Sequence, residues 1–396
     1  MSANAFSFPY TFFRQKPEEV FTELKNAHLT GVNLALNYHA SRDFLLRQGP
    51  QLEYLKDGFH YYKPDLNKYG QDAIVPGSAD HLSDNSMLGS VIKAAKSMGM
   101  KVNAWLVFAH NSAVGKAEPS ATVRNALGNN FLSELCPANP RVQRYFLGMV
   151  SDLISRGIDG IVAESLHFHG ARHGEHHERF FMELSPTTEF LFSLCFCDSC
   201  IAAFNGDGLT LKKKVTDELK PFLEDGDPWL GKEVSKESLA AIAGPEILDY
   251  LKSREKVVSG IYKSIHELTK AAGVTFSYED QSTLLDMNST TPLNLSWLVG
   301  INNEEIQKYV DSYLPLVYRK TPNEVAQVAT HYKNLIKCNL DAILRPTYPD
   351  CESESELIEK VGKLKSAGVN GTDFYLLDTW RPRDLQRVAA ALERIA

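Results

Sequence analysis

Residues 139–164 read NPRVQRYFLGMVSDLISRGIDGIVAE, which joins a helix pattern to a buried-strand pattern. Apolar residues recur three and four positions apart in its first part, which predicts an amphipathic helix over residues 139–156. Gly157 ends that helix, and the apolar run 160–163 predicts a strand that delivers Glu164 to its end. The fold follows from the repetition of this unit along the chain.

Strand patterns alternate with helix patterns over the whole length, which predicts a parallel sheet covered by helices. The helix patterns include residues 246–272 and 354–366. Eight strand–helix units favour a closed (β/α)8 TIM barrel forming a single domain over residues 1–396. A doubly wound sheet is less favoured because no glycine-rich phosphate-binding turn follows the first strand. The predicted strands cover residues 6–10, 32–37, 102–108, 160–163, 274–278, 313–318, 342–344 and 373–377.

Two long insertions interrupt the alternation of strands and helices. Residues 38–84 follow the second strand and are too long for an ordinary connection, so we expect them to lie over a site. Residues 165–245 follow the fourth strand and carry a histidine-rich loop and a cluster of cysteines.

Composition excludes several classes of protein. A formal net charge of −7, with no basic cluster beyond Lys212, Lys213 and Lys214, argues against nucleic-acid binding. No apolar run is long enough for a membrane span, and no signal-peptide pattern opens the chain, so we expect a cytoplasmic protein. Six cysteines in a chain of 396 residues are too few for a disulfide scaffold. Assembly into a homo-oligomer is left open.

In a barrel of this kind, catalytic residues lie on the loops after the strands, at one face. Glycoside hydrolysis needs two carboxyl groups there, one to protonate the leaving oxygen and one to act as nucleophile or base. Glu164 is the first candidate, as general acid or acid/base, because it follows a buried strand. Glu279 and Asp280 both end the fifth strand, and alternation of side chains predicts that only one faces the site. Asp378 is a third candidate for the second carboxylate.

The strand ends are also rich in aromatic and polar residues. Aromatic rings stack on the apolar faces of sugars, while amides, acids and arginine bond hydroxyl groups, so this mixture suits a small carbohydrate. We expect no organic cofactor. The predicted substrate contacts are Tyr38, His39, Trp105, His110, Asn111, His167, His169, Tyr278, Arg345, Tyr348, Asp378 and Trp380.

The cysteines form the spacing C-x-C-x2-C at Cys195, Cys197 and Cys200. With Cys136 as a fourth ligand they could hold a structural zinc ion in tetrahedral coordination. Other candidates for the fourth ligand are Cys338 and Cys351, and free thiols are the alternative interpretation.

The loop after Glu164 contains many imidazoles, which bind metals and also bond sugar hydroxyls. It could hold a catalytic metal together with Glu164, line a sugar pocket, or be only a solvated polar loop. Its histidines are His167, His169, His173, His176 and His177.

A Cys-Pro-x-x-Pro motif, a helix, a strand ending in Glu, and C-x-C-x2-C followed by Phe204 occur in that order over residues 135–204. This order resembles the catalytic barrel of family 42 glycoside hydrolases, the β-galactosidase type, and related barrels grouped with glycoside hydrolases. The resemblance implies that Glu164 is the acid/base. It also implies zinc bound by the four ligands Cys136, Cys195, Cys197 and Cys200.

The chain departs from that family at two positions. Ala163 stands where the family has Asn, and the seventh predicted strand ends in Arg345, where the family has its nucleophilic glutamate. We therefore expect a cytoplasmic glycosidase whose second acid comes from another strand, with zinc holding the loop after the fourth strand and taking no part in the chemistry. The alternatives are a metal-dependent barrel lyase, isomerase or hydrolase that uses the histidines, and a barrel that binds sugars without cleaving them.

Overall fold

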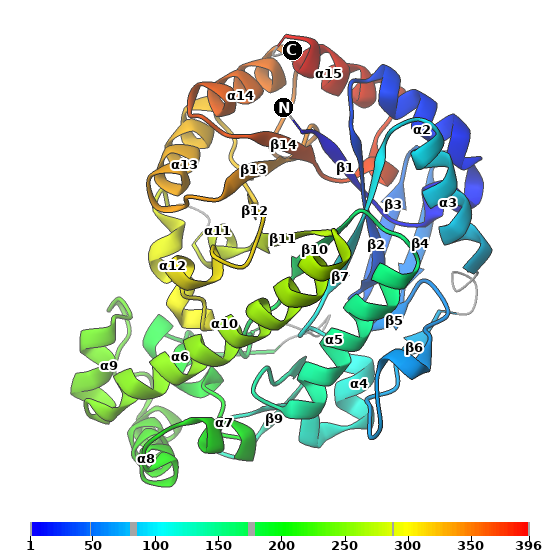
Figure 1. The fold of residues 1–396 in the computed structure, drawn as a ribbon. Coiled ribbons are helices and arrows are strands. Elements are labelled where there is room, and N and C mark those ends of the chain that lie inside the picture. Colours follow the sequence, from blue (N-terminus) through cyan, green and yellow to red (C-terminus); the bar gives the residue numbers. More distant parts are fainter. Residues whose placement is uncertain (1, 48, 80–84, 173–178, 287–288, 395–396) are drawn as a thin grey trace.

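A computed structural model describes residues 2–47, 49–79, 85–172, 179–286 and 289–394. Parallel strands form a closed barrel, because β1 pairs with both β2 and β14 (Figure 1). The predicted TIM barrel is confirmed. Its eight strands are β1 (Asn4–Ser7), β2 (Gly31–Tyr38), β7 (Lys101–Val107), β10 (Gly160–Glu164), β11 (Thr275–Asp280), β12 (Ser312–Pro315), β13 (Asn339–Leu344) and β14 (Gly371–Phe374).

Helices follow the strands and cover the outside of the barrel (Figure 1). The α5 helix shows why they form here: the Asn139 side chain accepts a hydrogen bond from the Arg141 N–H, Pro140 occupies the first turn, and one face is buried. These helices are α2 (Pro17–Asn26), α3 (Asn85–Ser97), α5 (Pro140–Ser155), α10 (Glu246–Ala272), α12 (Asn303–Ile306), α13 (Pro322–Leu335), α14 (Glu354–Ser366) and α15 (Pro382–Glu393).

Three strands are shorter than the apolar patterns predict, and the eighth strand of the barrel, expected to reach residue 377, ends at Phe374. The first was expected to reach Tyr10, but that residue opens α1 (Tyr10–Arg14) directly after Pro9. The sixth was expected to reach residue 318, but β12 ends at Pro315, beyond which only an isolated bridge at Leu316 continues the pairing. Proline supplies no N–H to a sheet, which explains why the sixth strand ends where it does.

Side chains alternate between the two sides of each barrel strand. On β10, Ile161 and Ala163 pack in the core between sheet and helices, whereas Val162 belongs to a separate cluster that includes Trp105 of β7. That second cluster takes alternate residues from most strands and fills the barrel interior. Glu164 lies two positions after Val162 and therefore points into the barrel as well.

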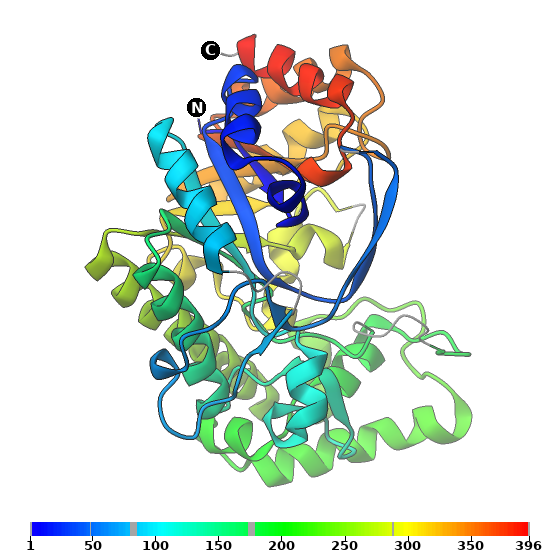
Figure 2. The same ribbon diagram turned by 90° about the vertical axis from the view of Figure 1, so that its right-hand side faces the viewer.

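The connection after β2 forms a hairpin of β3 (Ser41–Leu45) and β4 (Gln51–Leu55), followed by β5 (Phe59–His60), the 3-10 helix η1 (Leu66–Lys68) and β6 (Gly77–Ser78). The backbone N–H groups of Leu46 and Arg47 donate to the carbonyl oxygen of Asp378, over 3.2 and 3.3 Å. The hairpin thus reaches from the second strand to the loop after the eighth (Figure 2).

Three further connections carry elements beside the mouth of the barrel. The connection after β7, which the sequence patterns did not reveal, holds α4 (Ser112–Ala117), η2 (Pro119–Ala121), β8 (Thr122–Arg124) and β9 (Asn130–Leu135). The connection after β10 holds α6 (Pro186–Ser193), α7 (Asp198–Ala203), α8 (Gly208–Asp225) and α9 (Lys236–Ala243), which gather beside α10 (Figure 1). After β11 come α11 (Ser282–Leu285) and η3 (Pro292–Val299), and after β14 comes η4 (Leu377–Thr379).

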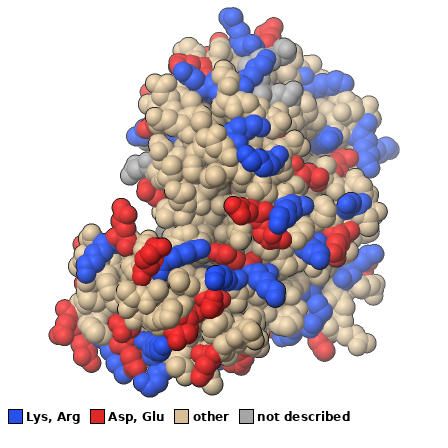
Figure 3. Space-filling model, turned by 60° about the vertical axis from the view of Figure 1, so that its left-hand side comes forward, with Lys and Arg blue, Asp and Glu red and all other residues tan. Residues whose placement is uncertain are grey.

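The surface shows mixed charge. On the face in Figure 3, Lys and Arg side chains are interspersed with Asp and Glu. Within the described ranges, no helix combines the length and apolar character needed to cross a membrane.

A buried polar network crosses the seam where the barrel closes. Asp373 of β14 accepts hydrogen bonds from the backbone and side-chain N–H groups of Asn4 on β1 and from the Asn33 amide on β2. Asn33 in turn accepts one from the Asn103 amide on β7. Burial, followed by the nearby Asp341 carboxylate, raises the pKa of Asp373 to about 7, while the bonds from Asn4 and Asn33 act in the opposite direction.

Asp373→Ala should lower the free energy of unfolding by about 2–3 kcal/mol, because it leaves the buried donors of Asn4 and Asn33 without an acceptor. Urea unfolding followed by circular dichroism measures this change. The control Asp217→Ala removes a carboxylate on α8 whose surface ion pairs with Lys213 and Lys220 contribute little, so it should shift the midpoint only slightly. Equal midpoints for both variants would contradict the view that Asp373 stabilises the pairing of β14 with β1 and β2.

Candidate active site

Glu164 lies at the end of β10 and is 3% exposed. The Trp105 indole donates to its Oε2 over 2.7 Å, and the Gln281 amide donates to its Oε1 over 2.9 Å. Burial raises the pKa of Glu164 to about 7, while these two hydrogen bonds act in the opposite direction. Both oxygens therefore meet groups that can only donate, which favours the ionised form of this carboxyl group.

Glu279 lies beside Glu164 on the neighbouring strand. Ala163 of β10 pairs with Tyr278 of β11, so the next residues, Glu164 and Glu279, stand at the same level. Glu279 is 4% exposed, and its Oε2 accepts no hydrogen bond from any described residue. Burial, followed by the negative charge of Glu164, raises the pKa of Glu279 well above its usual range, while the Trp105 indole acts in the opposite direction. Two carboxyl groups this close and this buried do not both ionise readily, so the pair retains a proton near neutral pH.

Aromatic side chains surround the two carboxyl groups. The Trp105 ring lies 4.8 Å from the Tyr38 ring and 5.8 Å from the Tyr375 ring, measured between centroids. The hydroxyl oxygens of Tyr38 and Tyr375 lie 3.3 Å apart. Burial, followed by nearby charges that include Glu164, raises the pKa of Tyr38, and burial likewise raises that of Tyr318. These tyrosines stay protonated and can donate hydrogen bonds.

Arg345, predicted as a substrate contact, lies against the rings of Tyr318 and Tyr375. Its guanidinium lies 3.8 Å from the centroid of the Tyr318 ring and 3.1 Å from Asp350 Oδ2. Tyr348, predicted beside it as a substrate contact, is 80% exposed and lies on the surface. The structure therefore brings Arg345 to the mouth and leaves Tyr348 away from the carboxyl pair.

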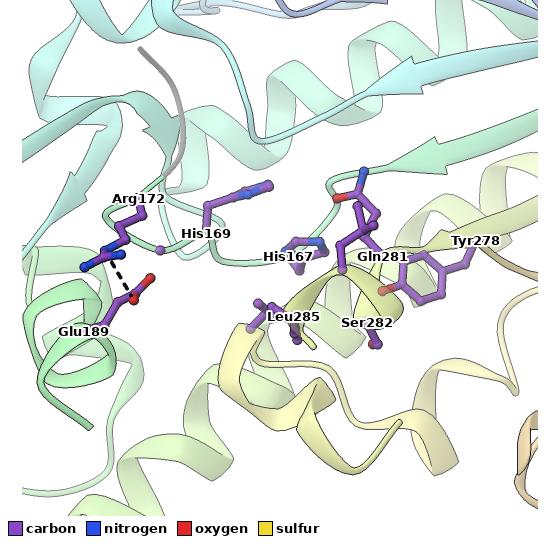
Figure 4. A pocket seen from close by; sticks show the side chains of 11 residues that line it. His167, His169, Arg172, Glu189, Tyr278, Gln281, Ser282 and Leu285 are labelled. Atoms are coloured by element: carbon purple, nitrogen blue, oxygen red, sulfur yellow. Dashed lines mark ion pairs between the residues drawn. The ribbon is translucent and has the colours of Figure 1, made fainter. Parts of the chain in front are cut away.

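Figure 4 shows a cavity of about 300 Å³ formed mainly by residues that follow β10 and β11 in the chain. The Gln281 side chain belongs to its wall and also donates to Glu164, so it links the cavity to the buried carboxyl group. Cavities of this size hold small ligands. The wall is formed by His167, His169, Gly170, Arg172, Glu189, Tyr278, Gln281, Ser282, Leu284, Leu285 and Val299.

The polar groups of this cavity are spread along its length. In Figure 4, Arg172 and Glu189 face each other at one end, with 3.5 Å between Nε and Oε2, and Gln281 lies toward the other. His167 and His169 lie between them, with ring centroids 4.5 Å apart. Both predicted histidines thus line the cavity.

Two further predicted histidines continue this row. His39 stacks on His110 at 5.2 Å between centroids, and His110 lies 6.1 Å from His169. His169 Nδ1 lies 3.7 Å from Glu134 Oε2, a buried carboxylate. Imidazoles near a carboxylate can exchange protons or bond hydroxyl groups of a ligand.

The metal-dependent alternative requires these histidines to share an ion with Glu164. Within the described residues, the cysteines are the one group of three or more metal-ligating side chains whose ligand atoms lie close together. Glu164 instead bonds Trp105 and Gln281. His173, His176 and His177, also named for that role, lie outside the described residues.

Asp280 does not join the carboxyl pair. It follows Glu279 and points to the other side of β11, where its Oδ2 accepts from the Tyr332 hydroxyl of α13 over 2.6 Å. Its Oδ1 accepts from Tyr278 and from both the backbone N–H and the hydroxyl of Ser282. These bonds fasten β11 to its surroundings.

Asp378 is also fully bonded within the fold. Its carboxylate accepts from the Phe8 N–H and from the Ser7 and Thr11 hydroxyls, so it holds the loop after β1. Burial raises its pKa to about 6, with those bonds acting in the opposite direction.

Asn111 and Trp380 are also placed within the fold. Asn111 accepts from the Val114 N–H and caps α4, and Trp380 is buried in the core between sheet and helices. Neither residue is among those that line the cavity.

Gln281 and Tyr375 were absent from the predicted site. Gln281 directly follows the two acids of β11, but a glutamine after a strand carries no signal by itself. Tyr375 lies two positions after Asp373 in the predicted eighth strand, so side-chain alternation places it on the same face as that carboxyl group.

The predicted cysteines form one buried group. Cys136 Sγ lies 3.8, 3.5 and 3.4 Å from the sulfurs of Cys195, Cys197 and Cys200. Four sulfurs bound tetrahedrally at about 2.3 Å from one ion would lie about 3.8 Å apart, so the arrangement fits a metal ion. Cys338 and Cys351, the alternatives for the fourth ligand, donate instead to the backbone carbonyl groups of Asn339 and Ser353.

Comparison with known proteins relates the chain to others through its fold. No family model matches the sequence, and no curated protein matches it. The structure is similar to α-L-fucosidase isoenzyme 2 from Paenibacillus thiaminolyticus, with a TM-score of 0.57 at 10% identity, covering 100% of this chain and 49% of that one. It is also similar to the β-galactosidase from the psychrophilic Marinomonas ef1, with a TM-score of 0.57 at 11% identity, covering 100% and 59%.

A third solved structure is similar over nearly its whole length. The catalytic domain of β-amylase from Paenibacillus polymyxa has a TM-score of 0.55 at 13% identity, covering 97% of this chain and 95% of that one. The chain spans about half the length of the fucosidase and about three-fifths of that of the galactosidase. At these identities the comparisons confirm that the chain shares the barrel fold of glycoside hydrolases.

Proposed function

We propose that this protein is a glycoside hydrolase that acts on a small glycoside or oligosaccharide. The observation that carries the proposal is the pair Glu164 and Glu279, buried at the same level on adjacent strands at the carboxyl ends of a barrel. Catalysis by a pair of acids needs one protonated and one ionised member, and the environments of this pair separate the two states. The surrounding tyrosines and the histidines of the cavity suit a polyhydroxylated ligand.

The hydrogen bonds assign the two roles. Trp105 lowers the pKa of both carboxyl groups, but Gln281 donates to Glu164 alone, and Glu279 Oε2 has no described donor, so Glu279 is the better holder of the proton. Glu279 then protonates the glycosidic oxygen, and the Glu164 carboxylate attacks the anomeric carbon. This assignment reverses the roles expected from the sequence, in which Glu164 was the acid.

Adjacent strands lie about 4.8 Å apart, close to the carboxyl separation of about 5–5.5 Å in retaining glycosidases. We therefore assign Glu164 as a nucleophile that forms a glycosyl ester. Water then hydrolyses that ester with Glu279 as the base, which restores both groups to their starting protonation states.

A panel of nitrophenyl glycosides tests the activity directly. We expect at least one to be cleaved, and Glu164→Gln and Glu279→Gln each to lower kcat/KM by about three decades or more, because each removes an acid that no neighbour replaces. Glu304→Gln, an exposed glutamate on α12, is the matched control and should keep the wild-type rate. Absence of cleavage across the panel, or a loss of only a few-fold, would contradict the proposal.

Leaving groups distinguish the two roles. Glu279→Ala should still form the glycosyl ester from dinitrophenyl glycosides, which need no proton to leave, and added azide should speed its turnover. Glu164→Ala should lose activity on every leaving group. Burst kinetics and the anomeric configuration of the product, read by NMR, provide the measurement, and the opposite pattern would restore Glu164 as the acid.

The pH profile follows from the raised pKa values. Glu164 must be ionised, so kcat/KM should rise as the pH increases through about 7 and fall only where Glu279 loses its proton, at higher pH. Gln281→Met removes a hydrogen bond that lowers the pKa of Glu164, so it should move the acidic limb to higher pH. If the acidic side of the profile stays in place or moves to lower pH in Gln281→Met, the ionisation of Glu164 does not cause the rise in kcat/KM.

We also infer that the four-cysteine group holds a structural zinc ion. Such an ion would tie the segment after β9, which carries Cys136, to the start of α7, which carries Cys200. Both segments lie outside the barrel interior that holds the carboxyl pair, so the ion takes no part in the chemistry.

Elemental analysis should find about one zinc per chain, the stoichiometry of a closed four-thiolate site. Cys200→Ser should lose the ion and lower the melting temperature. Cys351→Ser changes a buried cysteine outside the group and should keep the zinc. Metal-free wild-type protein, with no metal taken up on reconstitution, would contradict the inference.

A further inference from the structure

Arg254 is a buried cation in an unusual setting. It lies on α10 and is 4% exposed, and its guanidinium lies 4.5 Å from the Phe168 ring centroid and 5.6 Å from that of Phe190. Its Nη2 donates to the Leu298 carbonyl over 3.3 Å, while Nε and Nη1 have no hydrogen-bond partner among the described residues. No described carboxylate forms an ion pair with it. A buried guanidinium without a counter-charge is strongly destabilising, so this position needs an explanation.

The four-cysteine group lies against the same face of α10. Tyr250, one helical turn before Arg254, donates its hydroxyl to the Cys195 carbonyl over 2.5 Å and stacks on Phe196 at 5.0 Å between centroids. Burial lowers the pKa of Arg254, and the groups acting in the opposite direction are Cys200, Tyr250, Cys195 and Cys136. The sulfurs attract the guanidinium only when they are thiolates.

The charge of a metal-loaded four-cysteine group would explain why Arg254 is buried beside it. A divalent ion held by four thiolates has a net charge of −2, since metal binding requires each thiol to lose its proton. Such a charge in the core needs a nearby cation. Arg124, whose backbone N–H donates to Cys195 Sγ, is half-exposed and its guanidinium already pairs with Asp198. Arg254, by contrast, is buried and forms no ion pair with any described carboxylate.

We propose that Arg254 is the counter-charge of the four-cysteine metal site and a positioning residue for the cavity. The guanidinium packs on Phe168, which separates the two cavity histidines, and bonds Leu298, which precedes the cavity residue Val299. The backbone N–H of Phe168 also donates to the Val299 carbonyl over 3.0 Å. A metal site outside the barrel is thereby coupled to two walls of the cavity. The inference rests on the proposed zinc site.

The test compares zinc affinity in wild-type protein, Arg254→Met, Arg254→Lys and Lys256→Met, by competition with a chromogenic chelator. Arg254→Met should weaken zinc binding about 10–100-fold, as loss of an outer-shell partner does. Arg254→Lys keeps the charge and should restore most of the affinity. Lys256→Met makes the same change of charge at an exposed position of the same helix and should leave it unaltered.

The thermal stability of the zinc-loaded and zinc-free proteins distinguishes a counter-charge role of Arg254 from a role in packing alone. Arg254→Met should destabilise the zinc-loaded protein, but it should not destabilise the protein after strong chelation, where neutral thiols leave the wild-type arginine uncompensated. Equal destabilisation of both forms would overturn the proposal, and so would zinc affinity unchanged by Arg254→Met. Arg254→Lys gives a second readout if the methionine variant does not fold: weak zinc binding despite a kept charge would contradict the counter-charge role.

The zinc site and the role of Arg254 can be refuted separately. Wild-type protein that binds no zinc would refute that site, whereas tight binding by both wild type and Arg254→Met would refute only the role of Arg254. For a cleaved substrate from the nitrophenyl panel, Arg254→Met should raise KM more than it lowers kcat, because Arg254 supports the cavity walls and does not contact the carboxyl pair.

Discussion

The structure depends on the burial of two carboxyl groups side by side inside a closed barrel. Glu164 and Glu279 stand at the same level of neighbouring strands, and they are only 3% and 4% exposed. Two negative charges in that setting would repel strongly, so a proton must stay with the pair. The indole and amide donors at Glu164 decide which member keeps the charge, and the tyrosines around them remain neutral. An arrangement that resists full ionisation is also one that can transfer a proton.

A second buried polar region lies outside the barrel, where Tyr250, one turn before the buried Arg254 on α10, donates to the Cys195 carbonyl beside the four cysteines. The carboxyl pair limits its charge by keeping a proton, whereas an ion held by four thiolates, as proposed above, would carry a net negative charge that Arg254 would balance. The two regions meet at the loop after β10, which begins at Glu164 and continues to Phe168 and the cavity histidines. The same loop therefore connects Glu164 to the wall of the cavity.

Local patterns were sufficient for most of the fold. The helices at 246–272 and 354–366 have the bounds predicted for them, because apolar periodicity is a local property and their ends carry local signals: Gly273 adopts the left-handed conformation and Ser353 caps α14. The β8–β9 hairpin was not predicted, since its two short strands are stabilised by pairing with each other and by packing on α4. The end of β1 at Ser7, two residues before Pro9, and the end of β12 at Pro315 show a backbone constraint overriding an apolar pattern.

The sequence alone determined the eightfold alternation, the acids at the ends of the fourth and fifth strands, and the cysteine spacing, because each is a matter of residue type and position along the chain. Only the tertiary structure decided which side of β11 faces the interior, and so placed Glu279 beside Glu164 and Asp280 against α13. It also assigned Asp378 and Asn111 to holding loops, and it brought Gln281 and Tyr375 to the carboxyl pair. Alternation relates neighbouring side chains to each other, but closure of the barrel selects the inward face, and closure depends on contacts between residues far apart in the chain.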